Sequence, residues 1–146
     1  MGKVKAVPDG YGTVTPFLNI KGASDAIDFY KRAFGAEELN RFTTPSGDIA
    51  VAILKIGTSL VRISDAVKEA ATQSTMHLYV EDVDMWWKRA IGAGCEQVFP
   101  LQQMFFGDKF GIVKDRFGNR WSMATHIEDV SEPELRKRAA EMANVR

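Results

Sequence analysis

Apolar and polar residues follow two different periods along the chain, and these periods separate predicted strands from predicted helices. Apolar side chains at alternate positions predict a strand from Val14 to Ile20. Apolar residues then recur every three or four positions after Ser24 and Asp25, either of which can cap a helix, and Gly35 is a natural helix end. Turn residues separate three further extended segments, at 38–43, 49–56 and 59–64.

The second half of the chain shows the same order of elements. A strand is predicted from Thr75 to Val80, followed by a helix that Asp82 caps and that Gly92 and Gly94 end. Its apolar stripe includes two tryptophans, which we expect to pack against the sheet. Three extended segments follow, at 97–99, 109–114 and 120–124.

Short sequences also repeat between the two halves. Lys31–Ala36 recurs as Lys88–Ala93, and Gly47-Asp48 recurs as Gly107-Asp108 in the same order, which favours an internal duplication. We predict a single domain, 1–146, with a first βαβββ unit at 12–66, a second at 74–128 and a charged helical tail at 131–146 that starts with a capping box. The predicted fold class is α+β, with both units forming a curved mixed sheet around a cleft.

Composition narrows the classes of function. The 146 residues are 45% hydrophobic, which is enough for a sizeable core. Nineteen basic and nineteen acidic residues give a formal net charge of zero, which argues against nucleic-acid and anionic-membrane partners. Cys95 is the only cysteine, and no apolar run is long enough to span a membrane, so we predict a cytoplasmic protein.

Six segments together make the chain recognisable: 13–18, 26–36, 77–84, 106–111, 115–118 and 121–131. In them the chain resembles the vicinal oxygen chelate superfamily, which contains glyoxalase I, extradiol dioxygenases and the fosfomycin- and bleomycin-resistance proteins. The resemblance is closer to the PhnB-like branch. It implies the glyoxalase/bleomycin-resistance fold, a cleft for a small organic ligand, and a homodimer paired side by side or by swapping.

The resemblance also implies where a divalent metal would bind, at inward-facing positions on the first and last strands of each unit. The matching residues are Thr15, Val61, His77 and Ser122. Only His77 is a strong ligand, whereas a metal site of this kind needs about three. PhnB-like relatives commonly carry His-Ala-Glu where this chain has Val51–Ile53. We therefore predict no cofactor, and a divalent metal is the disfavoured alternative.

Several residues are candidates for contact with a ligand. The predicted ligand-binding set is Thr15, Phe17, His77, Phe105, Phe106 and Ser122. His77 is also the candidate catalytic residue, because its intrinsic pKa is near neutrality. For His126 a turn or interface role is favoured over catalysis, and Asp108 is interpreted as part of a surface turn. Arg62 interrupts an apolar strand, where an ion pair with an acidic residue or extension of its charge to solvent is favoured over anion binding.

Three functions are consistent with these features. The first is a small-molecule-binding protein with a metal-free cleft. The second is an enzyme that uses His77, either a metal-dependent glyoxalase- or dioxygenase-type lyase or oxidoreductase, or a metal-free isomerase or lyase. The third is a non-catalytic dimeric interaction module.

Overall fold

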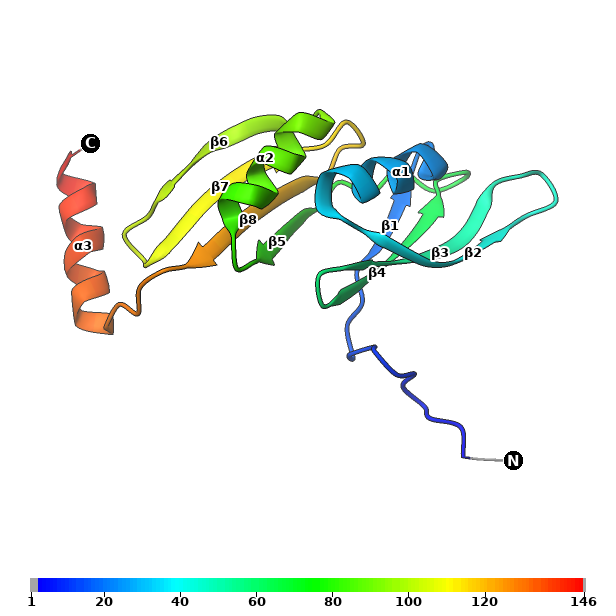
Figure 1. The fold of residues 1–146 in the computed structure, drawn as a ribbon, viewed down its shortest axis with the longest axis horizontal. Helices are drawn as coiled ribbons and strands as arrows, with labels where there is room; N and C mark the ends of the chain where they lie inside the picture. The colour runs from blue at the N-terminus through cyan, green and yellow to red at the C-terminus, as the bar shows by residue number, and fades with distance from the viewer. Residues whose placement is uncertain (1–2, 146) are drawn as a thin grey trace. The chain divides into compact units, whose positions relative to one another are not determined.

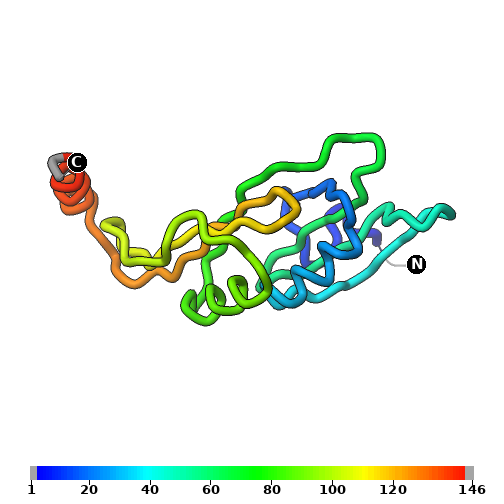
Figure 2. Tube along the Cα trace, turned by 90° about the horizontal axis from the view of Figure 1, so that it is seen from above, coloured from blue at the N-terminus to red at the C-terminus, as the bar shows by residue number. Residues whose placement is uncertain are grey.

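The computed structural model describes residues 3–145, with eight strands and three helices in that range (Figure 1). Each half of the chain contributes one helix to the side of its own four-stranded sheet, as Figure 2 shows from above. The elements of the first half are β1 (Phe17–Ile20), α1 (Ala23–Phe34), β2 (Glu37–Thr43), β3 (Ile49–Ile56) and β4 (Ser59–Asp65). Those that follow are β5 (Thr75–Tyr79), α2 (Val83–Ala93), β6 (Glu96–Gln103), β7 (Asp108–Lys114), β8 (Arg120–His126) and α3 (Glu132–Val145).

The strands are hydrogen-bonded in two sheets with the same topology. Their orders are β1-β4-β3-β2 and β5-β8-β7-β6. In each sheet the first strand pairs in parallel with the last, and the other neighbours are antiparallel. The helix after the first strand provides the crossover that a parallel pair needs. This confirms the predicted α+β class with βαβββ units and a C-terminal helix, although the mixed sheet is divided in two.

Close packing groups the residues into two compact units. The first extends to Gln73 and also includes Arg116–Gly118, while the second contains Ser74–Asp115 and the chain from Asn119 onward. Phe117 contributes to the first unit through edge-on ring contacts with Phe29 and Tyr30, at centroid distances of 5.9 and 6.2 Å. Each unit therefore has its own packed core.

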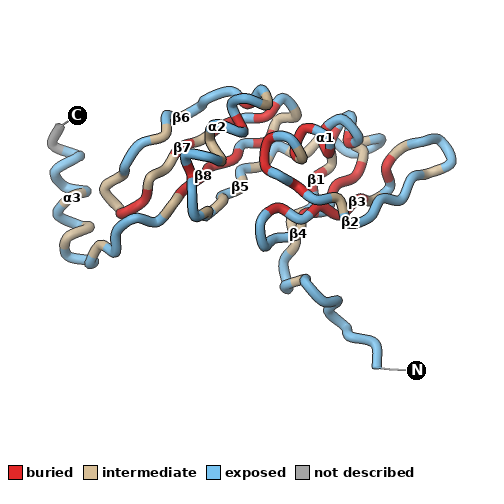
Figure 3. The backbone as a smooth tube through the Cα atoms, viewed as in Figure 1, coloured by how far each residue is buried: buried red, intermediate tan, exposed pale blue. Residues whose placement is uncertain are grey.

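Each sheet has one face against its helix and one face away from it, which we call the open face. In the first unit, β1 and β4 pair Leu18 with Ile63, both fully buried on the side of α1. Because side chains alternate along a strand, the neighbouring pair Phe17 and Arg62 belongs to the open face. Figure 3 shows buried residues along α1 and its sheet, and a largely exposed α3.

The start of α1 differs from the prediction. Neither Ser24 nor Asp25 caps the helix, because both lie inside it and Gly22 is the N-cap residue, with φ 77°. The first free N–H group, that of Ala23, donates instead to Oδ1 of Asp65, at 2.9 Å. A carboxylate at the end of β4 thus replaces the local cap, a contact that no pattern near the helix indicates.

The second helix confirms one predicted boundary and corrects another. Asp82 caps α2 and accepts a hydrogen bond from the backbone N–H of Met85. Gly94, with φ 114°, ends the helix, whereas Gly92 lies within its last turn. Only a residue in the left-handed region can close the helix here, so the end falls at the second glycine.

Strand lengths differ most from the predictions in β1 and β6, and by one or two residues in β2, β4, β5, β7 and β8. β1 begins at Phe17 rather than Val14, because its pairing with β4 starts only there. β6 extends to Gln103 and so passes through Pro100. Since β6 is an edge strand, the missing N–H of this proline removes no hydrogen bond that the sheet requires.

The C-terminal helix begins as predicted. The backbone N–H of Glu134 donates to Oγ of Ser131 at 3.3 Å, and α3 then continues to Val145. Among the described residues, no helix has both the length and the apolar character needed to cross a membrane.

Candidate functional site

Equivalent pairs of side chains lie on the open faces of the two units. The register pairs Phe17 with Arg62 in the first unit and His77 with Ser122 in the second. Phe17 is therefore the counterpart of His77, and Arg62 is the counterpart of Ser122. The prediction that Val61 occupies the inward-facing metal position on the last strand of the first unit is wrong, because this side chain is only 5% exposed and faces α1. A shift of one residue along a strand reverses the face, and short segments such as this leave the register ambiguous.

His77 forms a defined polar contact in the second unit. Its Nδ1 lies 2.7 Å from Oγ of Ser122, whose hydroxyl donates to the backbone carbonyl of Met76 at 3.3 Å. The serine oxygen is then left to accept, which assigns the proton of the neutral imidazole to Nδ1. The other nitrogen, Nε2, retains its lone pair. His77 can therefore accept a hydrogen bond from a bound molecule or take a proton from it.

Aromatic rings surround His77. Its ring meets Tyr79 edge-on, at a centroid distance of 4.6 Å, and stacks on Phe110 at 5.9 Å. Phe106 contacts Phe110 at 6.0 Å and Phe105 at 5.3 Å. These contacts bring His77, Phe106 and Ser122 of the predicted set close to one another, while Phe105 lies one ring further away.

A buried carboxylate lies beside this group. Asp108 is 2% exposed, and it accepts hydrogen bonds from the hydroxyl of Tyr79 at 2.6 Å and from Nδ1 of His126 at 2.7 Å. Nε2 of His126 lies 2.7 Å from Asp129. The interpretation of Asp108 as a surface turn residue is therefore wrong, because its side chain holds two rings together. Sequence reasoning missed both Tyr79 and Asp108, although the repeated Gly-Asp pair marked the position.

These contacts shift the ionisation of both rings. Hydrogen bonds to Asp108 first, and then to Asp129, raise the pKa of His126 because they favour the imidazolium. The hydrogen bond to Asp108, followed by burial, raises the pKa of Tyr79. The phenol thus keeps its proton, and its hydroxyl donates a hydrogen bond to the carboxylate.

A cavity of about 570 Å³ lies on the open face of the first unit. The N-terminal segment forms one wall, and Thr15, Phe17, Ile53 and Arg62 are among the lining residues. This brings together Thr15 and Phe17 of the predicted set. The guanidinium carbon of Arg62 lies over the ring of Phe17, 4.7 Å from its centroid. Arg62 forms no ion pair within residues 3–145, so a cation–π contact replaces the ion pair that was one of the alternatives.

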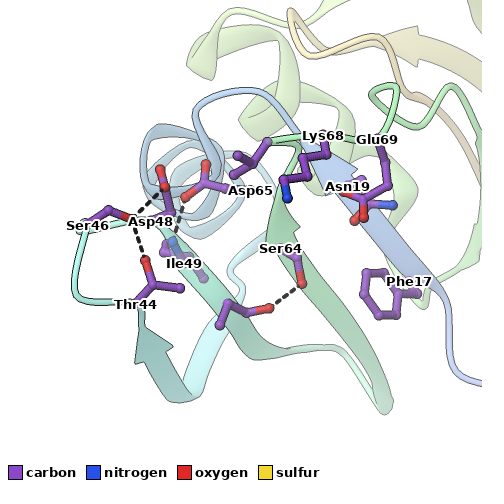
Figure 4. A pocket seen from close by; sticks show the side chains of 12 residues that line it. Phe17, Asn19, Thr44, Ser46, Asp48, Ile49, Ser64, Asp65, Lys68 and Glu69 are labelled. Atoms are coloured by element: carbon purple, nitrogen blue, oxygen red, sulfur yellow. Dashed lines mark hydrogen bonds between the residues drawn. The ribbon is translucent and has the colours of Figure 1, made fainter.

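A second cavity, of about 420 Å³, borders the β2–β3 turn (Figure 4). Its polar groups largely stabilise the fold. Asp65 accepts backbone N–H groups from Ala23 at 2.9 Å and Ile49 at 2.6 Å, and the hydroxyl of Ser64 donates to the carbonyl of Ala50 at 2.7 Å. Because Asp65 and Ser64 are used in these hydrogen bonds, the candidate ligand-binding groups are those of the other cavity and those around His77.

The open-face residues do not fit a divalent metal. In the first unit the pair is an aromatic ring and a cation, Phe17 and Arg62, and in the second unit it is an imidazole and a hydroxyl, His77 and Ser122. A guanidinium repels a metal ion, and a neutral hydroxyl beside a single imidazole is a weak donor set. Across residues 3–145, no three His, Cys, Asp or Glu side chains are grouped so that they could hold a metal ion.

Comparison with known proteins identifies the superfamily of this chain. Residues 12–123 match the family model described as the Glyoxalase/Bleomycin resistance protein/Dioxygenase superfamily. The chain belongs to this superfamily, as its resemblance had indicated.

Individual proteins are similar to the chain over most of its length. It is 35% identical over 134 residues to the uncharacterized protein Mb0911c of Mycobacterium bovis, an alignment that covers 84% of this chain and 88% of the relative. The crystal structure of TioX from Micromonospora sp. ML1 superposes with a TM-score of 0.65 at 24% identity, covering 78% of this chain and 99% of TioX. A PhnB protein from Bacillus cereus gives 0.65 at 19% identity, with coverage of 78% and 99%. These two structures share its fold.

Proposed function

We propose that each unit of this protein can bind a small organic molecule on its own open face without the help of a divalent metal. The observation that carries the proposal is the pair of counterpart positions in each unit. Phe17 with Arg62, and His77 with Ser122, provide ring faces, a cation and hydrogen-bonding groups. This chemistry recognises an organic ligand but gives a metal too few donors.

The surroundings of His77 support the same function. Small-molecule sites combine apolar and aromatic walls with a few polar groups that fix the orientation of the ligand. Here the aromatic groups are Phe106 and Phe110, and the polar group that remains open to a ligand is Nε2 of His77, because the hydroxyls of Ser122 and Tyr79 already form hydrogen bonds within the protein. Tyr79 is 63% exposed although its hydroxyl is held in place, so an ordered ring faces solvent.

The protein partner that we propose is a second copy of this chain. Membership of the superfamily supports it, because the resemblance to this superfamily implies a homodimer. The exposed ring of Tyr79 provides apolar surface that a second copy would cover. Light scattering coupled to size exclusion should give about twice the 16.3 kDa mass of one chain, and the mass of a single chain would contradict the dimer.

Metal analysis and a fragment screen test the binding function. Protein purified without chelators is analysed for zinc, manganese, nickel and iron, and a fragment library is screened by amide NMR shifts. We expect substoichiometric metal, together with fragment-induced shifts around His77 that disappear in His77→Ala. Lys88→Ala is the matched control, because Lys88 is exposed on α2, on the opposite side of the same sheet. One equivalent of tightly bound metal, or a library that shifts neither open face, would refute the proposal.

A further inference from the structure

We infer that the cavity of the first unit binds an organic anion, a carboxylate on a flat or apolar body, and that Arg62 is the residue that contacts the carboxylate. This inference rests on the proposed small-molecule function and names the class of ligand. It concerns the cavity of about 570 Å³ between the N-terminal segment and the open face of the first sheet.

The geometry of Arg62 leaves its hydrogen-bond donors available. The guanidinium lies over the ring of Phe17, 4.7 Å from the centroid, so its flat face is used by the aromatic contact. The N–H groups of a guanidinium lie in its plane and point outward, in a fork that matches the two oxygens of a carboxylate. No side chain within the described range forms a hydrogen bond or an ion pair with Arg62. The cation is thus held in place by Phe17 and has no anionic partner among the residues that the structure describes.

The charges around the two cavities of the first unit differ. Among the described residues that line the larger cavity, Arg62 is the charged one and none is acidic. The smaller cavity is lined by Asp48, Asp65 and Glu69 with a single lysine, Lys68. An anion is therefore attracted to the cavity of Arg62 and repelled from the neighbouring one.

The other walls favour an apolar body on the anion. Val7, Phe17 and Ile53 provide apolar surface, and Thr13 and Thr15 add hydroxyl groups. The volume falls within the range of small-molecule sites, from about 300 to about 1,000 Å³. Inorganic anions would use the guanidinium alone, whereas an aromatic carboxylate would use both the cation and the apolar wall.

A second arginine in the same unit provides a matched control. The guanidinium carbon of Arg116 lies 4.9 Å from the ring centroid of Phe117, so it makes the same kind of contact. Arg116 is exposed, and it lines neither of the two cavities. A general effect of removing an arginine from a phenylalanine ring would therefore appear in both Arg62→Gln and Arg116→Gln.

The experiment compares carboxylates with their neutral amides. Benzoate, phenylacetate and butyrate, each beside its amide, are titrated into the full chain by NMR and calorimetry. We expect at least one carboxylate to shift the amides of Thr15, Phe17 and Ile53 and to bind roughly tenfold tighter than its amide, a ratio typical of one charge-assisted hydrogen bond. Arg62→Gln should abolish this preference, Arg62→Lys should keep part of it, and Arg116→Gln should leave it unchanged. Circular dichroism of each variant checks its folding.

The outcomes separate this inference from the proposed function. If both members of each pair shift the cavity residues equally, and Arg62→Gln changes nothing, the anion inference is overturned while small-molecule binding stands. If no carboxylate binds at the cavity of the first unit, the inference is likewise overturned, and the fragment shifts around His77 still decide the proposed function on their own. Inorganic phosphate that binds as tightly as benzoate would overturn the requirement for an apolar body.

Discussion

Two glycines occupy equivalent turns of the two units, and the structure predicts that alanine has different effects at these two positions. Gly47 and Gly107 each precede the third strand of their unit, with φ 91° and 94°. Each donates its N–H to the carbonyl three residues earlier, Gly47 to Thr44 at 2.9 Å and Gly107 to Met104 at 3.2 Å. The backbone conformation therefore disfavours alanine to a similar extent at both.

Their surroundings are different. A methyl group at Gly47 would meet no atom within 4 Å, whereas at Gly107 it would overlap the carbonyl oxygen of Glu128 and come within 3.1 Å of a methyl of Val130. The backbone there is tied down, because the N–H groups of Ile127 and Glu128 donate to the carbonyl of Gly107, at 2.8 and 3.0 Å. The overlap therefore cannot be relieved without breaking these bonds.

The expected losses of stability follow from the backbone conformation and from the steric overlap. The left-handed conformation costs alanine about 1–2 kcal/mol, which is partly offset by the lower entropy of the unfolded chain. Overpacking adds about 1–3 kcal/mol at Gly107 only. We expect Gly47→Ala to lower the free energy of unfolding by about 1 kcal/mol and Gly107→Ala by about 2–4 kcal/mol.

Urea unfolding measures both changes. Circular dichroism follows the whole chain, and tryptophan fluorescence follows the second unit, which contains Trp86, Trp87 and Trp121. The turn that ends at Gly107 also carries Phe105 and Phe106, so Gly107→Ala should shift their NMR signals. Equal destabilisation by the two substitutions would show that the contact with Glu128 is not what limits the turn.

Three further predictions concern ionisable groups. The pKa of His126 is raised by Asp108 and Asp129, so the stability it contributes is complete below its unfolded pKa of about 6.5 and is lost as the pH rises through the raised value. Urea midpoints of His126→Gln should therefore lack this pH dependence, and an unchanged profile would refute the pairing. Tyr79→Phe removes one donor from the buried Asp108 and should cost about 1–2 kcal/mol in urea unfolding, whereas no loss would contradict that bond. Burial raises the pKa of Cys95 to about 12, so iodoacetamide should alkylate it far more slowly in the native protein than in urea at pH 8, and equal rates would contradict its burial.

Local sequence patterns were sufficient to predict an element or a helix end wherever it depends on residues close together in the chain. Apolar spacing and turn residues predicted the bounds of β3, and Asp82 and Gly94 were recognised at the ends of α2. The same reasoning failed at the start of α1, because the group that satisfies Ala23 is Asp65, 42 residues away in the chain. A cap that comes from another element has no local signature.

In the candidate site, too, local patterns predicted some residues correctly and failed for another. Alternation along β5 placed His77 on the face away from the helix, and its partner Ser122 was in the predicted set. The fourth strand was misassigned by one residue, and this error exchanged Arg62 for Val61. Because β4 has the apolar Leu60 on one face and Val61 and Ile63 on the other, alternation alone does not distinguish these two registers, whereas the parallel pairing of Arg62 with Phe17 decides between them.

The sequence by itself determined the order of elements, the duplication and the superfamily, since these depend on periodicity and on residues close together in the chain. Only the tertiary structure decided which side chains meet. It buried Asp108 between Tyr79 and His126, and it placed Arg62 over Phe17 at the wall of a cavity. The physical reason is that burial and charge pairing depend on which strands lie side by side, and that arrangement follows from the packing of each unit as a whole.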